Sequence, residues 1–223
     1  MRLFGPLHLT LIAVIIAVAI TFAKLTAARR IPITPLRRTL GVLIAAGEFV
    51  WWVFRYSHEG IHAANLPLQL CDLSVWLSVA ACLTLRPAIV EFAYFAGIAG
   101  AGMAILTPDL WSPWPSYAAI YFFVAHGGIV IAASMLVFGR VVPLRRGAVW
   151  RVFGWLLTYA AALGVLNAIT GANYMYLNRK PESRSLLDSL GPWPFYLLPA
   201  TALTLGLFWL LWLPAPKQPE IEM

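Results

Sequence analysis

The chain has 223 residues, of which 61% are hydrophobic and only 11% are charged, with a mean hydropathy of +0.79. A soluble domain carries about 25% charged residues and could not bury this many apolar side chains, so a soluble protein is excluded and the lipid bilayer is the expected partner. The net charge of +7 comes without a basic tract interleaved with aromatic residues, so we expect no nucleic-acid partner.

Seven apolar runs follow one another along the chain, each close to the roughly 20 residues that a helix needs to cross a bilayer. Only helices and closed barrels cross, and runs this continuous are not the alternating segments of a barrel. The sequence therefore predicts an all-α polytopic membrane protein, a bundle of seven transmembrane helices over 1–213, with a short cytoplasmic tail, 214–223. The predicted helices cover residues 7–28, 39–56, 66–85, 88–106, 117–138, 149–169 and 193–213.

The distribution of Lys and Arg predicts the orientation, because cytoplasmic loops carry the excess of these residues. One set of loops and helix ends holds eleven of them, and the opposite set holds five. We therefore expect the N-terminus outside and the C-terminus inside. The cytoplasmic set is Lys24, Arg29, Arg30, Arg37, Arg38, Arg86, Arg140, Arg145, Arg146, Arg151 and Lys217.

The stretch from His58 to His62 reads HEGIH and matches the HExxH pattern of zinc hydrolases, in which two His on one helical face bind the metal. Gly60 weakens a helix here by about 1 kcal/mol relative to Ala. A third ligand would have to come from a distant loop. We predict a polar loop, with no metal and no cofactor, and keep zinc-dependent proteolysis as a minor alternative.

Charged and polar residues inside the predicted spans are the main candidates for a site, since each costs about 2.5–3.5 kcal/mol at the bilayer centre on insertion scales. Asn65, Gln69 and Asp72 form one stripe at helical spacing along the third span. Glu48 lies midway along the second span and His126 midway along the fifth. These residues either line a pocket and relay protons, or hold helices together by hydrogen bonds.

Polar residues also gather after the sixth span, at the predicted outer level. Asn167, Asn173 and Tyr174 are followed by Arg179, Lys180 and Arg184 in the longest outer loop. We expect the loop to form a cationic lid over an outward-facing polar vestibule. Such a lid would attract a lipid phosphate or a small anionic ligand.

A nine-residue pattern, D-x-x-x-P-W-P-x-Y, occurs twice, beginning at Asp109 and at Asp188. Both copies precede a predicted helix. Proline suits a first helical turn, and Trp and Tyr suit the headgroup layer. The two copies are either similar helix starts or the mark of a duplicated helical hairpin.

Two segments carry a resemblance to a known family. Asn65-Leu-Pro-Leu-Gln-Leu-Cys-Asp72 resembles the LPLxLCD signature of the YwaF family of bacterial integral membrane proteins. Gly171-Ala-Asn-Tyr-Met-Tyr-Leu-Asn-Arg-Lys-Pro181, Ser185-Leu-Leu-Asp188 and Gly191-Pro-Trp-Pro194 resemble its second signature. The resemblance implies a multi-pass protein of the bacterial cytoplasmic (inner) membrane. Distant eukaryotic relatives include a proposed cysteine-dependent phospholipid acyltransferase, whose cysteine corresponds to a position near Leu68.

Two functions from different classes remain. The first is a carrier or sensor of a small solute or lipid, in which Glu48, Asp72 and His126 move protons or pair with the ligand. The second is a lipid acyltransferase, with Cys71 as nucleophile and His126 as base. Whether the protein is an enzyme stays open at this point.

Overall fold

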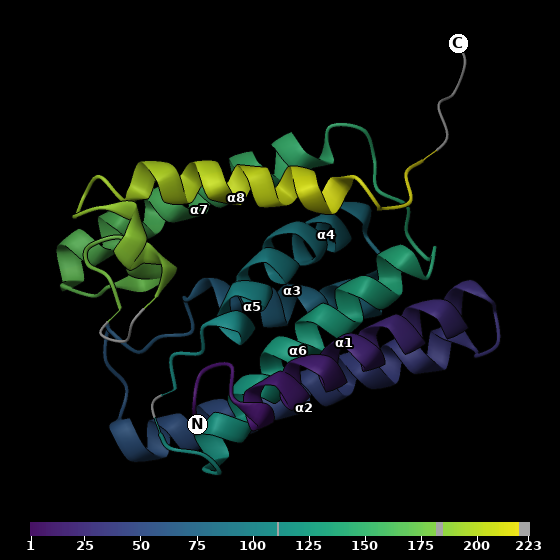
Figure 1. Cartoon of the computed structure of the whole chain (residues 1–223), viewed down its shortest axis with the longest axis horizontal. Helices are drawn as coiled ribbons and strands as arrows, with labels where there is room; N and C mark the ends of the chain where they lie inside the picture. The colour runs from purple at the N-terminus through teal and green to yellow at the C-terminus, as the bar shows by residue number, and fades with distance from the viewer. Residues whose placement is uncertain (111, 182–184, 219–223) are drawn as a thin grey trace.

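The computed structural model describes residues 1–110, 112–181 and 185–218, and Figure 1 shows their arrangement. Arg184, one of the three predicted lid cations, and residues 219–223 of the predicted tail lie outside this part of the chain. The described residues form helices joined by loops, together with one isolated bridge between Leu144 and Lys217. The all-α prediction is confirmed.

The α-helices are α1 (Pro6–Ala27), α2 (Ile33–Glu59), α3 (Leu70–Thr84), α4 (Pro87–Phe92), α5 (Ile98–Leu106), α6 (Tyr117–Phe138), α7 (Ala148–Thr170) and α8 (Leu197–Trp212). A π-helical turn, η1 (Ala93–Gly97), joins α4 and α5 into one continuous body. Two short 3₁₀ turns, η2 (Tyr174–Tyr176) and η3 (Leu186–Leu190), lie in the loop between α7 and α8.

Local sequence explains where several helices begin. Pro6 and Pro87 occupy the first turns of α1 and α4, where a missing N–H leaves no bond unmade. The Ser116 hydroxyl caps α6 by accepting a hydrogen bond from the Ala119 N–H. The third predicted span starts at Leu70 rather than at residue 66, because Gln69 and Asp72 form a capping box that sets the helix start.

Each of the seven predicted spans coincides with one helical body of the structure. Four of these bodies are long and apolar enough to cross a bilayer: Pro6–Ala27, Pro87–Leu106, Tyr117–Phe138 and Ala148–Thr170. Helices α3 and α8 are apolar but shorter, and α2 carries several charged residues. Large apolar side chains are exposed on several helices, such as Val124, Trp155 and Leu210, as expected of a surface that faces lipid.

The body of the molecule is built around α6, which packs against α1, α2, α3 and α5 (Figure 1). Glycines on α6 allow this close packing: a Cβ at Gly127 would lie 3.1 Å from Ile15 of α1, and one at Gly128 would lie 3.4 Å from Ile44 of α2. Helices α7 and α8 form a hairpin beside this body (Figure 1). The N-terminus lies at one end of the helices, and the last described residues, which follow α8, lie at the other end (Figure 1).

We call these two ends of the molecule the N-terminal end and the C-terminal end. The N-terminal end holds Met1 and the loops α2–α3, α5–α6 and α7–α8, and the C-terminal end holds the other loops. At the C-terminal end, Glu91 of α4 is only 1% exposed and accepts hydrogen bonds from Arg145 Nε (2.8 Å), Arg145 Nη2 (2.8 Å) and Arg151 Nη2 (3.1 Å). These bonds with Glu91 raise the pKa of Arg145. These bonds, which we call the Glu91 clamp, attach α7 and the loop before it to α4.

Candidate functional site

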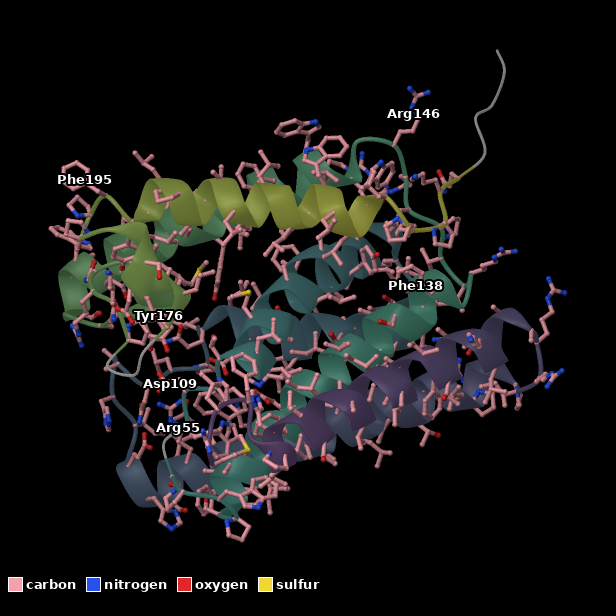
Figure 2. The ribbon with its side chains drawn as sticks, viewed as in Figure 1. Arg55, Asp109, Phe138, Arg146, Tyr176 and Phe195 are labelled. Carbon is pink, nitrogen blue, oxygen red and sulfur yellow. The ribbon has the colours of Figure 1, made fainter. Side chains whose placement is uncertain are left out.

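A cavity of about 530 Å³ opens at the N-terminal end, between the α7–α8 hairpin and the body. Figure 2 shows Arg55, Asp109 and Tyr176 at this end, with Phe138 and Arg146 at the opposite end. Helices α2, α3, α5, α6, α7 and α8 all contribute side chains to the wall. Among the sequence-predicted site residues, the cavity brings together Glu48, Gln69, Cys71, Asp72 and His126.

Glu48 lies on α2 and is only 2% exposed. The Trp52 Nε1–H, one turn further along α2, donates to Glu48 Oε1 at 2.7 Å. The Tyr121 hydroxyl of α6 donates to Oε2. The ring of Tyr121 stacks on that of Trp51, with their centroids 5.0 Å apart. The carboxylate is thus oriented by two donors from two helices, at the wall of the cavity.

Asp72 lies in the first turn of α3, where its position is set by the capping box. Its Oδ2 accepts the Gln69 backbone N–H at 2.9 Å. The Gln69 side-chain Oε1 in turn accepts the Met175 backbone N–H at 2.9 Å, so the loop after α7 is attached to the start of α3. Asp72 lies within Coulombic range of both Glu48 and Arg55. Gln69 and Asp72 therefore also connect the start of α3 to the loop after α7.

Cys71 and His126 share this cavity. Cys71 is a half-buried free cysteine at the start of α3. His126 Nδ1 lies 2.7 Å from the Phe122 carbonyl oxygen, one turn earlier on α6. A carbonyl only accepts, so Nδ1 carries the proton in this contact, and in the neutral ring Nε2 keeps a lone pair. The imidazole is therefore in the tautomer that a general base at Nε2 needs.

The lining changes character along the cavity. Polar groups lie near the helix ends: Gln69 and Asp72 begin α3, Arg55 is in the last turns of α2, and Asp109 follows α5. Toward the middle of the helices the wall is apolar apart from Glu48 and His126. The apolar wall includes Ala96, Ile129, Leu156, Ala200, Leu203, Leu207 and Phe208.

The loop between α7 and α8 forms part of the mouth of the cavity. Tyr176 of this loop donates a hydrogen bond from its hydroxyl to Asp109 Oδ2 at 3.2 Å, and its carbonyl accepts the Tyr196 hydroxyl. Burial, and then the neighbouring Asp109 carboxylate, raise the pKa of Tyr176, so its hydroxyl stays protonated and keeps donating. Leu187 and Leu190 of the same loop also line the cavity. We call the described part of this segment, 171–181 and 185–196, the lid.

Five predicted ligand-binding residues lie outside the lining of the cavity: Asn65, Asn167, Asn173, Tyr174 and Arg179. Asn167 is near the end of α7, and the other four are in the α2–α3 and α7–α8 loops. Asn167 brackets Tyr174 with hydrogen bonds to its backbone N–H (2.9 Å) and carbonyl (3.0 Å). The Tyr174 hydroxyl donates to the Ala63 carbonyl and accepts the Leu66 N–H. Asn65 and Asn173 bond to nearby backbone, and Asn173 closes a turn onto Arg179. Their role as ligands stays a prediction.

Several lining residues were not predicted as site residues: Trp51, Arg55, Asp109, Tyr121 and Tyr176. The headgroup layer favours Trp and Tyr at any helix end, so Trp51, Tyr121 and Tyr176 gave no separate signal of a site. Asp109 begins the first copy of the repeated pattern. The second copy begins at Asp188, which does not line the cavity, so the repeat alone could not have pointed to Asp109.

The HEGIH segment is divided by a helix end. Helix α2 stops at Glu59, and Gly60 adopts a positive φ of 73°. His58 is in the last turn, where Nδ1 lies 2.8 Å from the Phe54 carbonyl oxygen, and Glu59 pairs with Arg55 at 3.1 Å. Within the described residues, no group of three or more His, Cys, Asp or Glu side chains is arranged to hold a metal. The two histidines do not share a helical face.

The comparison with family models decides the family. The model of the TMEM164 family matches residues 3–212, nearly the whole chain. The chain belongs to the TMEM164 family. Comparisons with curated proteins and with solved structures find no significant match. The family match and the four long apolar helices together make this TMEM164-family chain a multi-pass membrane protein.

Proposed function

We propose that this TMEM164-family protein binds one membrane amphiphile in the cavity and acts as its carrier or sensor. The observation that carries the proposal is the change along the cavity wall, from polar and charged groups that lie mostly near helix ends to a wall at mid-helix that is apolar apart from Glu48 and His126. A lipid has the same gradient, with a polar head and an apolar chain, and ligand sites are mostly apolar with a few placed polar groups.

The weak attachment of α8 supports this proposal, because it offers the apolar chain a route from the bilayer. Phe208 is the one residue of α8 that is fully buried, while Leu203 and Ala200 remain accessible. Gly100 and Ala104 of α5 face the same space with small side chains. An acyl chain would lie between α5 and α8, with its head near Glu48 and Asp72.

We also infer the membrane arrangement. All seven helical bodies cross the bilayer, with the N-terminal end outside and the C-terminal end, which carries most of the Arg and Lys, in the cytoplasm. The short helices α3 and α8 cross with the help of their flanking loops. The resemblance of 65–72 and 171–194 to the YwaF signatures supports a bacterial inner-membrane location.

The proposal is tested by identifying what the purified protein retains. Gly100→Phe adds bulk to the cavity wall, whereas Gly102→Phe adds the same side chain on the same helix at a position that does not line the cavity. We expect mass spectrometry of the purified wild type and of Gly102→Phe to detect one amphiphile per chain, and Gly100→Phe to have lost it. Equal retention by both variants would contradict the proposal.

A second candidate is a lipid acyltransferase, favoured by one observation: Cys71 and His126 line the same cavity. In that reaction the His126 Nε2 would take the thiol proton, the Cys71 sulfur would attack a lipid ester carbonyl, and a lysolipid alcohol would leave with a proton. A second lipid hydroxyl would then attack the thioester and release the thiol.

Two substitutions separate the candidates. If the protein is a transferase, Cys71→Ala should abolish acyl transfer between supplied lipids. If the protein is a carrier, Cys71→Ala should leave amphiphile retention unchanged, since a carrier needs no nucleophile. Asp72→Asn should weaken retention. A carrier is supported if only Asp72→Asn has an effect on the protein's amphiphile content. A transferase is supported if Cys71→Ala stops turnover and traps the acyl donor in the cavity.

A further inference from the structure

We propose that a second site, at the C-terminal end, binds the phosphate of an anionic phospholipid between the start of α7 and the end of α8. The inference is independent of the proposed function, because this site and the mouth of the large cavity lie at opposite ends of the molecule (Figure 2). Its ligand is a resident lipid of the surrounding bilayer leaflet, not a molecule that the protein carries.

The first support is a small pocket between these two helix ends, which we call the C-terminal pocket. Its volume is about 100 Å³, and it is lined by residues 146–150 together with Trp209 and Trp212 of α8. The exposed rings of Trp150 and Trp209 meet edge to face, with their centroids 6.0 Å apart. Trp is typical of the headgroup layer, so this lining suits the depth at which lipid phosphates lie.

The second support is the charge of the residues next to the C-terminal pocket. The Glu91 clamp holds one carboxylate between the guanidinium groups of Arg145 and Arg151. Two positive charges and one negative charge leave one positive charge in excess. The clamp therefore adds to the positive potential at the start of α7 and does not cancel it.

Two further cations lie at the C-terminal pocket itself. Arg146 belongs to its lining, and its side chain extends away from the helices (Figure 2). Lys217 Nζ lies 5.1 Å from the centre of the Trp212 ring, which is part of the wall. Among the described residues, no Asp or Glu lines this pocket. Basic pockets between transmembrane helices attract anionic headgroups, so the charge here favours a lipid phosphate.

The backbone at the start of α7 attracts the same kind of ligand. Gly147 is the N-cap residue, with a positive φ of 73°, and in the described part of the chain no side chain caps this helix. The first turn also holds no acidic residue. The N–H groups of a first helical turn carry partial positive charge and favour anions. Because this turn lines the C-terminal pocket, it adds to the attraction of the two cations for a phosphate oxygen.

The lid, where the sequence predicted a phosphate, offers a different balance of charge. Lys180 Nζ lies 3.9 Å from Asp188 Oδ1, so it already has an acidic neighbour. The Arg179 backbone is held by the Asn173 side chain in a turn of the lid itself. At the C-terminal end, by contrast, Glu91 is the one carboxylate among the described residues. The C-terminal pocket is therefore the better place for an anionic headgroup.

The test measures lipid binding by native mass spectrometry of the protein in neutral maltoside micelles. Dioleoyl phosphatidylglycerol and dioleoyl phosphatidylcholine have the same acyl chains, but only the first has a net negative charge. Each Lys or Arg close to an anionic lipid contributes about a fivefold preference, so two such cations predict that phosphatidylglycerol binds roughly twentyfold more tightly. Glycerol phosphate, which lacks the acyl chains, should show no measurable binding.

Substitutions locate the binding. Arg146→Gln and Lys217→Gln should each reduce the preference for phosphatidylglycerol about fivefold. Arg140→Gln removes an exposed cation of the same end that does not line the C-terminal pocket, and it should leave the preference unchanged. All three side chains are exposed, so the unfolding midpoint without added lipid should stay the same. If Lys217→Gln lowers that midpoint, Arg146→Gln decides the matter.

The remaining outcomes separate the alternatives. Equal binding of the two lipids, or equal losses from Arg140→Gln and Arg146→Gln, would overturn the site, because any attraction would then belong to the whole basic surface. Glycerol phosphate binding as tightly as phosphatidylglycerol would overturn a lipid as the ligand. The preference should survive in Gly100→Phe, which fills the large cavity. Its loss there would assign the lipid to the large cavity, which would support the proposed function and overturn the second site.

Discussion

The Tyr121 hydroxyl on α6 donates a hydrogen bond to the Glu48 carboxylate on α2, joining two residues that are 73 positions apart in the sequence. The acid is buried, and its second oxygen is held by Trp52 of its own helix. Packing of α2 on α6 and orientation of a cavity carboxylate thus depend on the same bond.

Tyr121→Phe should therefore destabilise the protein. It keeps the ring stacked on Trp51 but leaves a Glu48 oxygen without its donor, which costs about 1–3 kcal/mol. The measurement is the thermal unfolding midpoint in detergent. Tyr117→Phe is the matched control, because Tyr117 is one turn earlier on the same helix face and also stacks with Tyr121. Equal midpoints for the two variants would show that the bond contributes little.

The clamp at Glu91 gives a second stability prediction. Glu91→Gln leaves the guanidinium groups of Arg145 and Arg151 without a buried anion, and breaking one partner of such a cluster costs about 3–5 kcal/mol. Both arginines are more than a third exposed, so water screens part of this interaction. We therefore expect the free energy of unfolding to fall by about 1–3 kcal/mol. The unfolding midpoint measures it. Arg140→Gln removes an exposed cation from the loop that also holds Arg145, and it should cause no comparable loss.

The hydrogen bond between Tyr176 and Asp109 should limit access to the cavity. Tyr176→Phe removes it, and we expect maleimide to label Cys71 about fivefold faster, because a single hydrogen bond is worth about 1 kcal/mol. Cys82 is fully buried and should not react in either protein. Tyr117→Phe again serves as the control. An unchanged labelling rate would mean that this bond does not keep the lid in place.

The proposed orientation can be checked with single cysteines in a background lacking Cys71 and Cys82. Arg179→Cys is at the N-terminal end and Arg140→Cys at the C-terminal end, and both positions are exposed. A membrane-impermeant maleimide should label Arg179→Cys in intact cells and label Arg140→Cys only after permeabilisation. The reverse pattern would place the N-terminus in the cytoplasm.

The sequence by itself determined the class of molecule and the positions of the helices. Apolar runs of about 20 residues have one stable form in a bilayer, because the backbone must satisfy its own hydrogen bonds there. An ionisable side chain within a span is costly to expose to lipid, so it needs a protein or water-filled surrounding. This cost identified Glu48, Asp72 and His126 as candidate site residues. All three line the cavity.

The tertiary structure decided which polar residues face the cavity and which hold the loops. Tyr174 and Tyr121 are the same type of residue, but the Tyr174 hydroxyl bonds to backbone groups of a neighbouring loop, whereas the Tyr121 hydroxyl bonds to Glu48 at the cavity wall. Asn65 and Asn167 also bond to loop backbone, and Gln69 does so while lining the cavity. Residue type and helical spacing predict that a side chain needs a hydrogen-bond partner. They do not predict whether that partner is a ligand or the chain itself, because the answer depends on which distant segments pack against it.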